Sequence, residues 1–320
     1  MNNNKIFIQI ASYRDPELKN TLKDLFNKSK FPENLKVCIA WQHSSADEWD
    51  NLDEFKNDSR LNIIDIDYSQ SKGACWARNL IQQRYSGEEY TLQLDSHHRF
   101  VQNWDEICIN TLKDLQAQGS KKPLLTSYIP SYNPSNDPEE RVDSVWGMSF
   151  HKFTPEGIVF FLPYYMNKQI TKPIRARFFS AHFAFTLGSH CLEVQHDPEY
   201  YFHGEEITLA VRSFTHGYDL YHPAKIIAWH EYTREGRTKQ WDDDNTWHIK
   251  NVNTHKKVRE LLGVDGEMQT VPHKYGFGSQ RTLKDYEAYS GITFNTRSIN
   301  EACKNNLEPN LDTLSRLTIV

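Results

Sequence analysis

The stretch that decides the fold is Tyr90–Phe100, with the sequence YTLQLDSHHRF. Its first half is apolar and rich in strand-forming residues, and it leads into Asp95 and, two positions later, His97. Because residues i and i+2 of a strand point to the same side, these two side chains are predicted to meet just beyond the strand end. A carboxylate and an imidazole together suit a divalent metal ion. The alternative is a hydrogen-bonded Asp–His pair that holds no metal.

Segments typical of strands and helices alternate along the first hundred residues. Strands are predicted over residues 6–11, 35–42 and 61–66, and helices over residues 18–26 and 74–81. This alternation predicts an α/β fold, with a mostly parallel sheet and helices on both of its faces. In such sheets, ligands bind at the carboxyl ends of the strands.

Polar residues fall at those strand ends or at the helix starts that face them. The first strand ends in Ser12, Tyr13 and Arg14, and Lys72 precedes the second helix. Arg78 lies one turn into that helix, from where a guanidinium could reach a phosphate or a uracil edge. These five side chains are the predicted nucleotide-binding residues. For Arg78, the alternative is a solvated helix face.

His230 ends a further apolar segment, residues 225–230, that is predicted to be a strand. If this strand opens onto the same cleft, Asp95, His97 and His230 provide three ligands for a divalent ion such as Mn²⁺ or Mg²⁺. Such an ion keeps open positions for a diphosphate. The alternative is that His230 caps the strand or bonds a backbone carbonyl.

Two adjacent carboxylates, Glu205 and Glu206, precede a helix that is predicted over residues 208–214. Carboxylates at a helix start are favoured by the helix dipole for purely structural reasons. The functional alternative is that they bind sugar hydroxyls, because aromatic residues that can cover a sugar face lie just before them, in residues 200–204. The two alternatives stay open on the sequence alone.

The remaining segments are less regular. Residues 123–173 are rich in turn-forming residues and are predicted to be mostly loop. Residues 234–244 are charged and predicted to be mobile, and basic residues at their start could close over a diphosphate. The tail from His248 carries two helical patterns. We therefore predict a catalytic domain over residues 1–250 and a packed helical extension over residues 251–320.

Composition limits the possible partners of this 320-residue chain. Its formal net charge is −5, so it lacks the basic field that attracts nucleic acid. The five cysteines are scattered, which predicts buried, reduced thiols in a cytoplasmic protein. No apolar run approaches the length of a membrane span, and no secretory signal is recognisable.

Several of these motifs, in this order, resemble the cytosolic hydroxyproline N-acetylglucosaminyltransferase family, glycosyltransferase family sixty. The resemblance covers about residues 5 to 295 of the sequence. It rests on residues 8–16, 93–97, 204–206, 215–221, 230–232 and 281–292. It implies a GT-A fold with a C-terminal extension, a UDP-sugar donor, UDP-GlcNAc above all, and a divalent metal.

The chain also resembles, more distantly, the polypeptide N-acetylgalactosaminyltransferases. In that family an Asp-x-His pair and a later histidine hold manganese, which corresponds here to Asp95, His97 and His230. Both families retain the configuration of the sugar, which implies an α-linked product.

Further roles follow from the second resemblance. An arginine that touches the diphosphate corresponds to Arg234, and a segment that contacts the donor sugar corresponds to Ser180, Ala181 and His182. The bulky His182 departs from the glycine of that family. The acidic motif corresponds to Glu205–Glu206, which are the predicted catalytic residues. Whether Glu205 is a nucleophile or binds sugar stays open, because internal return of the leaving group needs no enzyme nucleophile.

The sequence therefore predicts a metal-dependent, retaining glycosyltransferase that moves a hexose, GlcNAc in the first place, from UDP to a hydroxyl of a protein or glycan. One alternative is a transferase of glycan assembly, such as capsule or surface polysaccharide, with the same donor site. Another is a non-catalytic carbohydrate-binding module. A hydrolytic metalloenzyme is the alternative ranked last, since it would need a water-activating base near the metal.

Overall fold

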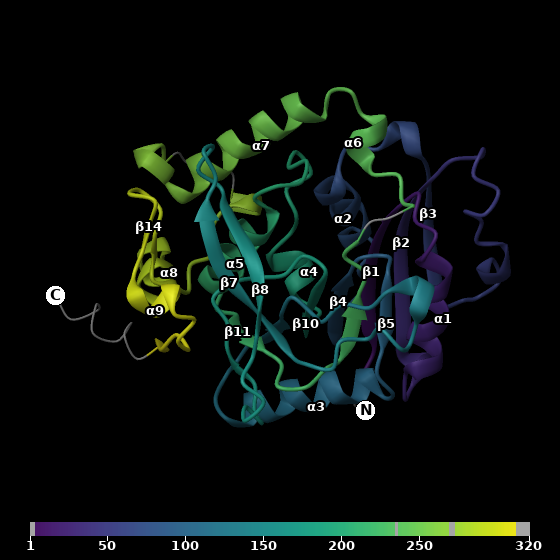
Figure 1. Ribbon diagram of the computed structural model, residues 1–320, viewed down its shortest axis with the longest axis horizontal. Coiled ribbons are helices and arrows are strands. Elements are labelled where there is room, and N and C mark those ends of the chain that lie inside the picture. The colour runs from purple at the N-terminus through teal and green to yellow at the C-terminus, as the bar shows by residue number, and fades with distance from the viewer. Residues whose placement is uncertain (1–3, 234–235, 269–272, 312–320) are drawn as a thin grey trace.

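A computed structural model describes residues 4–233, 236–268 and 273–311, and its centre is an eight-stranded sheet (Figure 1). All strands of this sheet run in one direction except β10 and β9, which are antiparallel to their neighbours. The strands lie in the order β3 (Leu61–Asp67), β2 (Leu35–His43), β1 (Ile6–Tyr13), β4 (Tyr90–Leu94), β10 (Phe183–Leu187), β6 (Pro123–Thr126), β11 (Asp219–His222) and β9 (Ile174–Arg175).

Helices cover both faces of the sheet, as predicted. Ile8 and Ile10 of β1 point to one face and pack in the same core cluster as Leu22 of α1 (Leu18–Lys28) and residues of α3 (Trp104–Ala117). Phe7 points to the other face and packs with Ile81 of α2 (Ala74–Gln82). The helices α4 (His190–Glu193) and α5 (Glu205–Thr215) lie on that second face. The alternation of side chains along each strand separates the two layers.

The strand order reverses between β1 and β4. The chain runs from β1 outward to β2 and β3, and then returns to the other side of β1 as β4. Such a switch point opens a crevice at the carboxyl ends of the two strands. Residues 12–14 end or follow β1, and Asp95 follows β4 directly, so the topology places the predicted site residues along this crevice.

A separate two-stranded sheet brings His230 to the same place. In it, β5 (His98–Phe100) pairs antiparallel with β12 (Ala228–His230), and His98 lies opposite His230. The backbone of His230 is also held from the other side, since its N–H donates to the Pro130 carbonyl at 2.9 Å. The Glu231 N–H donates to the His97 carbonyl at 3.2 Å, which links the two histidine segments directly.

Residues 123–173 are mostly irregular, as predicted, but they also contain strands that the sequence pattern did not indicate. This segment contains β6 and a hairpin of β7 (Trp146–Phe153) and β8 (Val159–Tyr165). Pro163 inside β8 hides the strand pattern, because proline is normally confined to strand edges. The hairpin has such an edge, since in the part of the chain that is described β8 pairs only with β7.

The C-terminal part carries α6 (Gln240–Asp243), α7 (Trp247–Leu262), α8 (Leu283–Ser290), β13 (Ile292–Thr293), β14 (Ser298–Ile299) and α9 (Glu301–Lys304). Val258 of α7 and Tyr286 of α8 pack in the same core cluster as Ile207 of α5. A boundary at residue 250 stays a prediction.

Within the described ranges, every helix is too short or too polar to cross a lipid bilayer. All five cysteines are buried and free of disulfide bonds.

Candidate metal and sugar-nucleotide site

Three predicted ligands converge at the crevice. One ligand atom from each of Asp95, His97 and His230 lies within 4.8 Å of the other two. The Nε2 atoms of His97 and His230 face the same carboxylate oxygen of Asp95, at 3.7 and 3.3 Å. One oxygen and two imidazole nitrogens form a donor set that suits Mn²⁺ and related divalent ions.

The segment from Asp95 to His97 is not part of a strand. It connects β4 to β5, and Thr21 of α1 fixes it by donating to the Ser96 carbonyl at 2.9 Å and accepting from the His98 N–H at 2.8 Å. Asp95 and His97 thus meet as predicted, but a side-chain clamp from α1 orients them, and not the two-residue period of a strand.

Buried partners orient the ligands from behind. Nδ1 of His97 donates to Oδ2 of Asp15 at 2.7 Å, which leaves the lone pair of Nε2 facing Asp95. Arg78 donates to the other carboxylate oxygen of Asp95 at 2.6 Å. A carboxylate behind a histidine ligand is the usual support of a metal site, so these residues fit a divalent ion. Nδ1 of His230, in contrast, has no hydrogen-bond partner among the described residues.

The surroundings of the cluster favour an ionised Asp95 and a neutral His230. Burial would raise the pKa of Asp95, but His230, Arg78 and His97 together hold this pKa well below its ordinary value. Burial and the neighbouring His182 lower the pKa of His230 well below its ordinary value. A carboxylate and a neutral imidazole are the forms that bind a metal ion.

Arg237 lies on the outer side of this cluster. Its guanidinium is 3.0 Å from Asp15 and 2.8 Å from Glu231. It also contacts both ring nitrogens of His97, and the contact with Nε2 measures 3.0 Å. A metal ion would use the same lone pair of Nε2, so binding requires this guanidinium to move.

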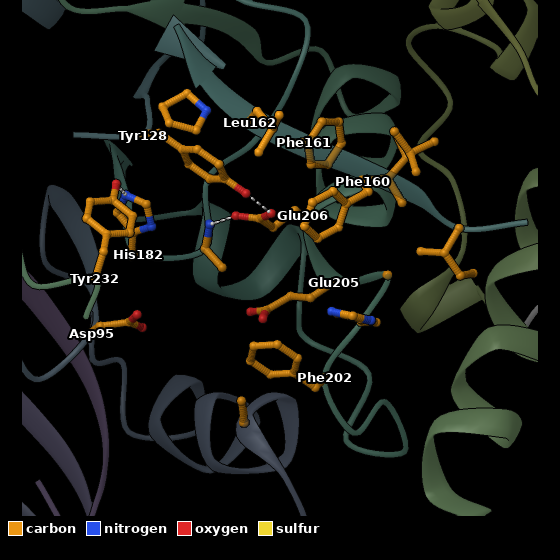
Figure 2. A pocket seen from close by; sticks show the side chains of 18 of the residues that line it. Asp95, Tyr128, Phe160, Phe161, Leu162, His182, Phe202, Glu205, Glu206 and Tyr232 are labelled. Atoms are coloured by element: carbon orange, nitrogen blue, oxygen red, sulfur yellow. Dashed lines mark hydrogen bonds between the residues drawn. The ribbon is translucent and has the colours of Figure 1, made fainter. Parts of the chain in front are cut away.

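A cavity of about 680 Å³ opens next to Asp95 and His230 (Figure 2). Aromatic and apolar side chains of the β7–β8 hairpin form one wall of it, among them Phe160, Phe161 and Leu162. Phe160 and Leu162 are exposed at 39% and 41%. Predominantly apolar walls with a few converging polar groups are typical of ligand sites.

Two carboxylates reach this cavity from the start of α5, and their surroundings differ. Glu206 accepts hydrogen bonds from the Tyr128 hydroxyl at 2.7 Å and from the Ala181 N–H at 3.0 Å (Figure 2). Burial raises the pKa of Glu206 to about 7, against the effect of these two donors. Glu205 lies deeper, 3.1 Å from Nε of Arg78, and burial raises its pKa above the ordinary value.

His182 lies between the metal cluster and Glu206. Its ring stacks on His230, with 4.3 Å between the ring centroids, and on Tyr128 at 5.1 Å. Its Nε2 accepts from the Ile129 N–H at 3.3 Å, so in the neutral ring Nδ1 carries the proton. Burial lowers the pKa of His182 to about 3, which keeps the ring neutral.

Comparison with known proteins decides the family. A family model described as "Glycosyltransferase (GlcNAc)" matches residues 5–60 and 50–296. The chain belongs to this GlcNAc glycosyltransferase family. No curated protein matches the sequence.

Solved structures show the fold of this family member to be of the GT-A type, as predicted. The crystal structure of GalNAc-T7 with UDP, GalNAc and Mn²⁺ matches at a TM-score of 0.56 and 13% identity, over 88% of this chain and 54% of that chain. The glycosyltransferase thus spans about half the length of GalNAc-T7. S. aureus TarS 1-349 in complex with UDP-GlcNAc matches at a TM-score of 0.49 and 11% identity, over 89% and 70% of the two chains.

Several predicted nucleotide-binding residues of the glycosyltransferase lie outside the cavity lining. The Tyr13 hydroxyl and the Arg14 guanidinium both donate to Asp243 of α6, at 2.7 and 2.9 Å. Ser12 is fully buried, and the ammonium of Lys72 lies 5.9 Å from the Trp76 ring centroid. They lie at the carboxyl end of β1 and before the N-terminus of α2.

The segment that was expected to contact the donor sugar reaches the cavity only in part. Ala181 and His182 line it, whereas Ser180 is fully buried and donates its N–H to Thr126. Arg78 lines the cavity from below, between two carboxylates. Arg234 lies outside the described residues.

Some residues of the site were missed or misread in the sequence. Asp15 was not among the predicted site residues, yet one of its oxygens holds His97 and Ser96. Tyr128, which contacts Glu206, lay in a segment without a recognised pattern, and Tyr232, which contacts His182, lay in the motif of residues 230–232 but was given no role. A tyrosine two residues after a metal-type histidine is a signal that could have indicated Tyr232, while nothing local indicates Tyr128.

Proposed function

We propose that the chain is a metal-dependent glycosyltransferase that moves GlcNAc from UDP-GlcNAc to a hydroxyl group of a protein or glycan acceptor. The observation that carries this proposal is the convergence of Asp95, His97 and His230 at the edge of a cavity lined by aromatic rings and two glutamates. The family match and the GT-A fold support it, as does the Mn²⁺ and UDP in the crystal structure of GalNAc-T7.

The metal ligands have a defined role in this proposal. A divalent ion held by Asp95, His97 and His230 supplies positive charge for the diphosphate leaving group. Arg78 keeps Asp95 ionised, and Asp15 orients His97. Arg237, on the loop that follows β12, contacts the outer side of His97, and we assign it the diphosphate contact that the resemblance suggested for Arg234.

The sugar is proposed to lie in the cavity, between the metal cluster and Glu206. The proton on Nδ1 of His182 has no acceptor among the described residues, and Figure 2 shows the ring beside the cavity. This N–H is available to a sugar hydroxyl or an N-acetyl oxygen. Glu206 is the carboxylate that reaches a hydroxyl of donor or acceptor, because Glu205 is paired with Arg78.

We propose retention of configuration without a glutamate nucleophile. Glu205 is 4% exposed and lies against a guanidinium, which disfavours attack on a sugar carbon. The free, buried cysteines support a reducing, cytoplasmic location.

One experiment tests the proposal directly. The full chain is incubated with a panel of UDP-sugars and Mn²⁺, and UDP release is measured with and without excess EDTA. We expect release from UDP-GlcNAc above the other donors, and its loss in EDTA. Full release in EDTA would overturn the metal role, and the absence of release together with metal-independent UDP binding would favour a carbohydrate-binding module. Nuclear magnetic resonance of the first-formed product gives the anomeric configuration.

A further inference from the structure

A second group of ligand-type side chains lies beneath the cavity. Cys75 stands in the first turn of α2, His196 follows α4, and Glu205 begins α5. One ligand atom of each lies within 4.8 Å of the other two. The three residues are between 1% and 4% exposed, and no residue of the Asp95 cluster belongs to this group.

The hydrogen bonds of His196 fix which of its nitrogens faces the group. The amide nitrogen of Gln93 donates to the Ala181 carbonyl at 2.8 Å, so the amide oxygen of Gln93 is the atom that faces Nε2 of His196, also at 2.8 Å. Nε2 must therefore carry the proton of the ring. The lone pair of Nδ1 points at a carboxylate oxygen of Glu205, at 3.2 Å.

The carboxylate of Glu205 and the Nδ1 lone pair of His196 thus face each other in the protein interior. The Glu205 oxygen, Oε1, meets no nitrogen donor in hydrogen-bond geometry, although Nε of Arg78 is 3.1 Å away, and the polar neighbour of the carboxylate within this group is the Cys75 thiol. The carboxylate hydrogen bond of Arg78 goes to Asp95, at 2.6 Å, so the contact of Arg78 with Glu205 is electrostatic only. A buried carboxylate oxygen opposite an imidazole lone pair is unfavourable unless a proton or a cation lies between them.

We propose that Cys75, His196 and Glu205 bind a zinc-class cation, in a site separate from the Asp95 cluster. Thiolate, imidazole and carboxylate are the usual zinc ligands, and the sulfur selects a softer ion than the oxygen and nitrogen set of Asp95, His97 and His230. The proton-accepting amide behind His196 is the usual support of a histidine ligand.

Charge and access are consistent with such a site. The Cys75 thiol releases its proton to solvent on binding, and the thiolate and the Glu205 carboxylate then offset the two charges of the ion. Glu205 also lines the cavity, as does Ala74 beside Cys75, so an ion and a water ligand can enter from there. Glu205 is then a ligand in the proposed enzyme, and Glu206 alone faces the substrate.

Cobalt substitution tests the proposal, because Co²⁺ bound to a thiolate shows a near-ultraviolet charge-transfer band that Co²⁺ on oxygen and nitrogen ligands lacks. The full chain is stripped of metal with a chelator and titrated with Co²⁺. We expect the band to saturate at one equivalent and to disappear when Zn²⁺ is added. Cys75→Ser and His196→Gln should each abolish or weaken it at least about tenfold.

Two variants serve as matched controls. Cys108→Ser removes an equally buried thiol in α3, and His97→Gln removes a ligand of the other site; both should keep the band. Near-ultraviolet circular dichroism checks that each variant is folded. The absence of a band in the wild type, or its persistence in Cys75→Ser, would overturn the proposal and leave a proton shared by Glu205 and His196. Neither outcome depends on transferase activity.

Discussion

At the residue scale, the Asp95 carboxylate has two roles. It faces Nε2 of two histidines with one oxygen and accepts from the buried Arg78 with the other. Removing this carboxylate removes a metal ligand and also leaves a buried guanidinium with one partner fewer. A substitution at Asp95 therefore changes both turnover and the free energy of unfolding. A substitution at His97 should change mainly turnover.

The first prediction concerns His97→Gln. We expect turnover to fall at least about 100-fold, because a ligand nitrogen is lost, with a loss of unfolding free energy below about 2 kcal/mol. Asp95→Ala should lose turnover as well and be less stable by about 1–3 kcal/mol, since Arg78 loses its charge partner. UDP release and urea denaturation measure the two effects. Wild-type turnover in His97→Gln would contradict the assignment.

The second prediction concerns the pKa of about 7 that burial gives to Glu206. If its carboxylate binds a reacting hydroxyl, kcat/KM should rise as pH increases through about 7, and Glu206→Gln should be slow and lack this step. A raised carboxyl pKa also means that the folded state binds the proton more tightly than the unfolded chain. Stability should therefore fall as pH rises from about 4.5 to about 7, by about 1–3 kcal/mol, and this fall should vanish in Glu206→Gln. A flat kcat/KM profile of the wild type would exclude the role.

The third prediction concerns His182→Gly. The substitution removes the free N–H and enlarges the cavity, so discrimination between UDP-GlcNAc and UDP-glucose should drop by about 10- to 100-fold in the ratio of kcat/KM values. His190→Gly is a control, because His190 is equally buried but bonds Ser213 away from the cavity. An unchanged donor ratio in His182→Gly would show that His182 only packs against His230.

At the element scale, the start of α5 is positioned by its contact with α7. Gly204 precedes Glu205 with a φ of +98°, and a Cβ on it would lie 2.4 Å from a methyl carbon of Val258. The close approach of these helices therefore sets where both glutamates enter the cavity. Glycine is favoured at position 204 because it adopts this positive φ without strain and leaves room for the Val258 methyl group.

The fourth prediction follows from that contact. Gly204→Ala should lower the unfolding free energy by about 2–4 kcal/mol, through backbone strain and overpacking together. Gly87→Ala is matched in backbone strain, with a φ of +102°, but its Cβ would meet no atom within 4 Å, so it should cost only about 1 kcal/mol. Denaturant titration gives both values. Equal losses would mean that the packing against α7 contributes nothing.

At the scale of the whole molecule, the cavity lies where the crevice of the sheet meets the β7–β8 hairpin. The sheet supplies Asp95, the small β5–β12 sheet supplies His230, and the hairpin closes the far wall. Three different parts of the structure thus line one ligand site, so a bound ligand should stabilise all three against unfolding.

The fifth prediction is such a stabilisation. Mn²⁺ with UDP, at about 100 times the dissociation constant, should add about 2.7 kcal/mol and raise Tm by several degrees. UDP with EDTA should raise it little, and His97→Gln should not respond to Mn²⁺ with UDP. Differential scanning calorimetry measures these shifts. An equal shift with and without the metal would contradict metal-assisted nucleotide binding.

The sequence by itself predicted β1 to β4 of the sheet, the helices α1, α2 and α5, and the three metal-type ligands. Period-two and helical patterns are local, and Asp95 and His97 are two residues apart, so short stretches such as residues 90–97 carry this information. The hairpin of β7 and β8 was missed because Pro163 interrupts its local pattern.

Only the tertiary structure decided how these ligands meet and what supports them. His230 reaches Asp95 through pairing with His98, more than a hundred residues away in the chain. Asp15, Tyr128 and the group of Cys75, His196 and Glu205 come together through the packing of separate helices and loops. Contacts of this kind depend on the register of distant strands and on helix packing, which no local pattern in the sequence records.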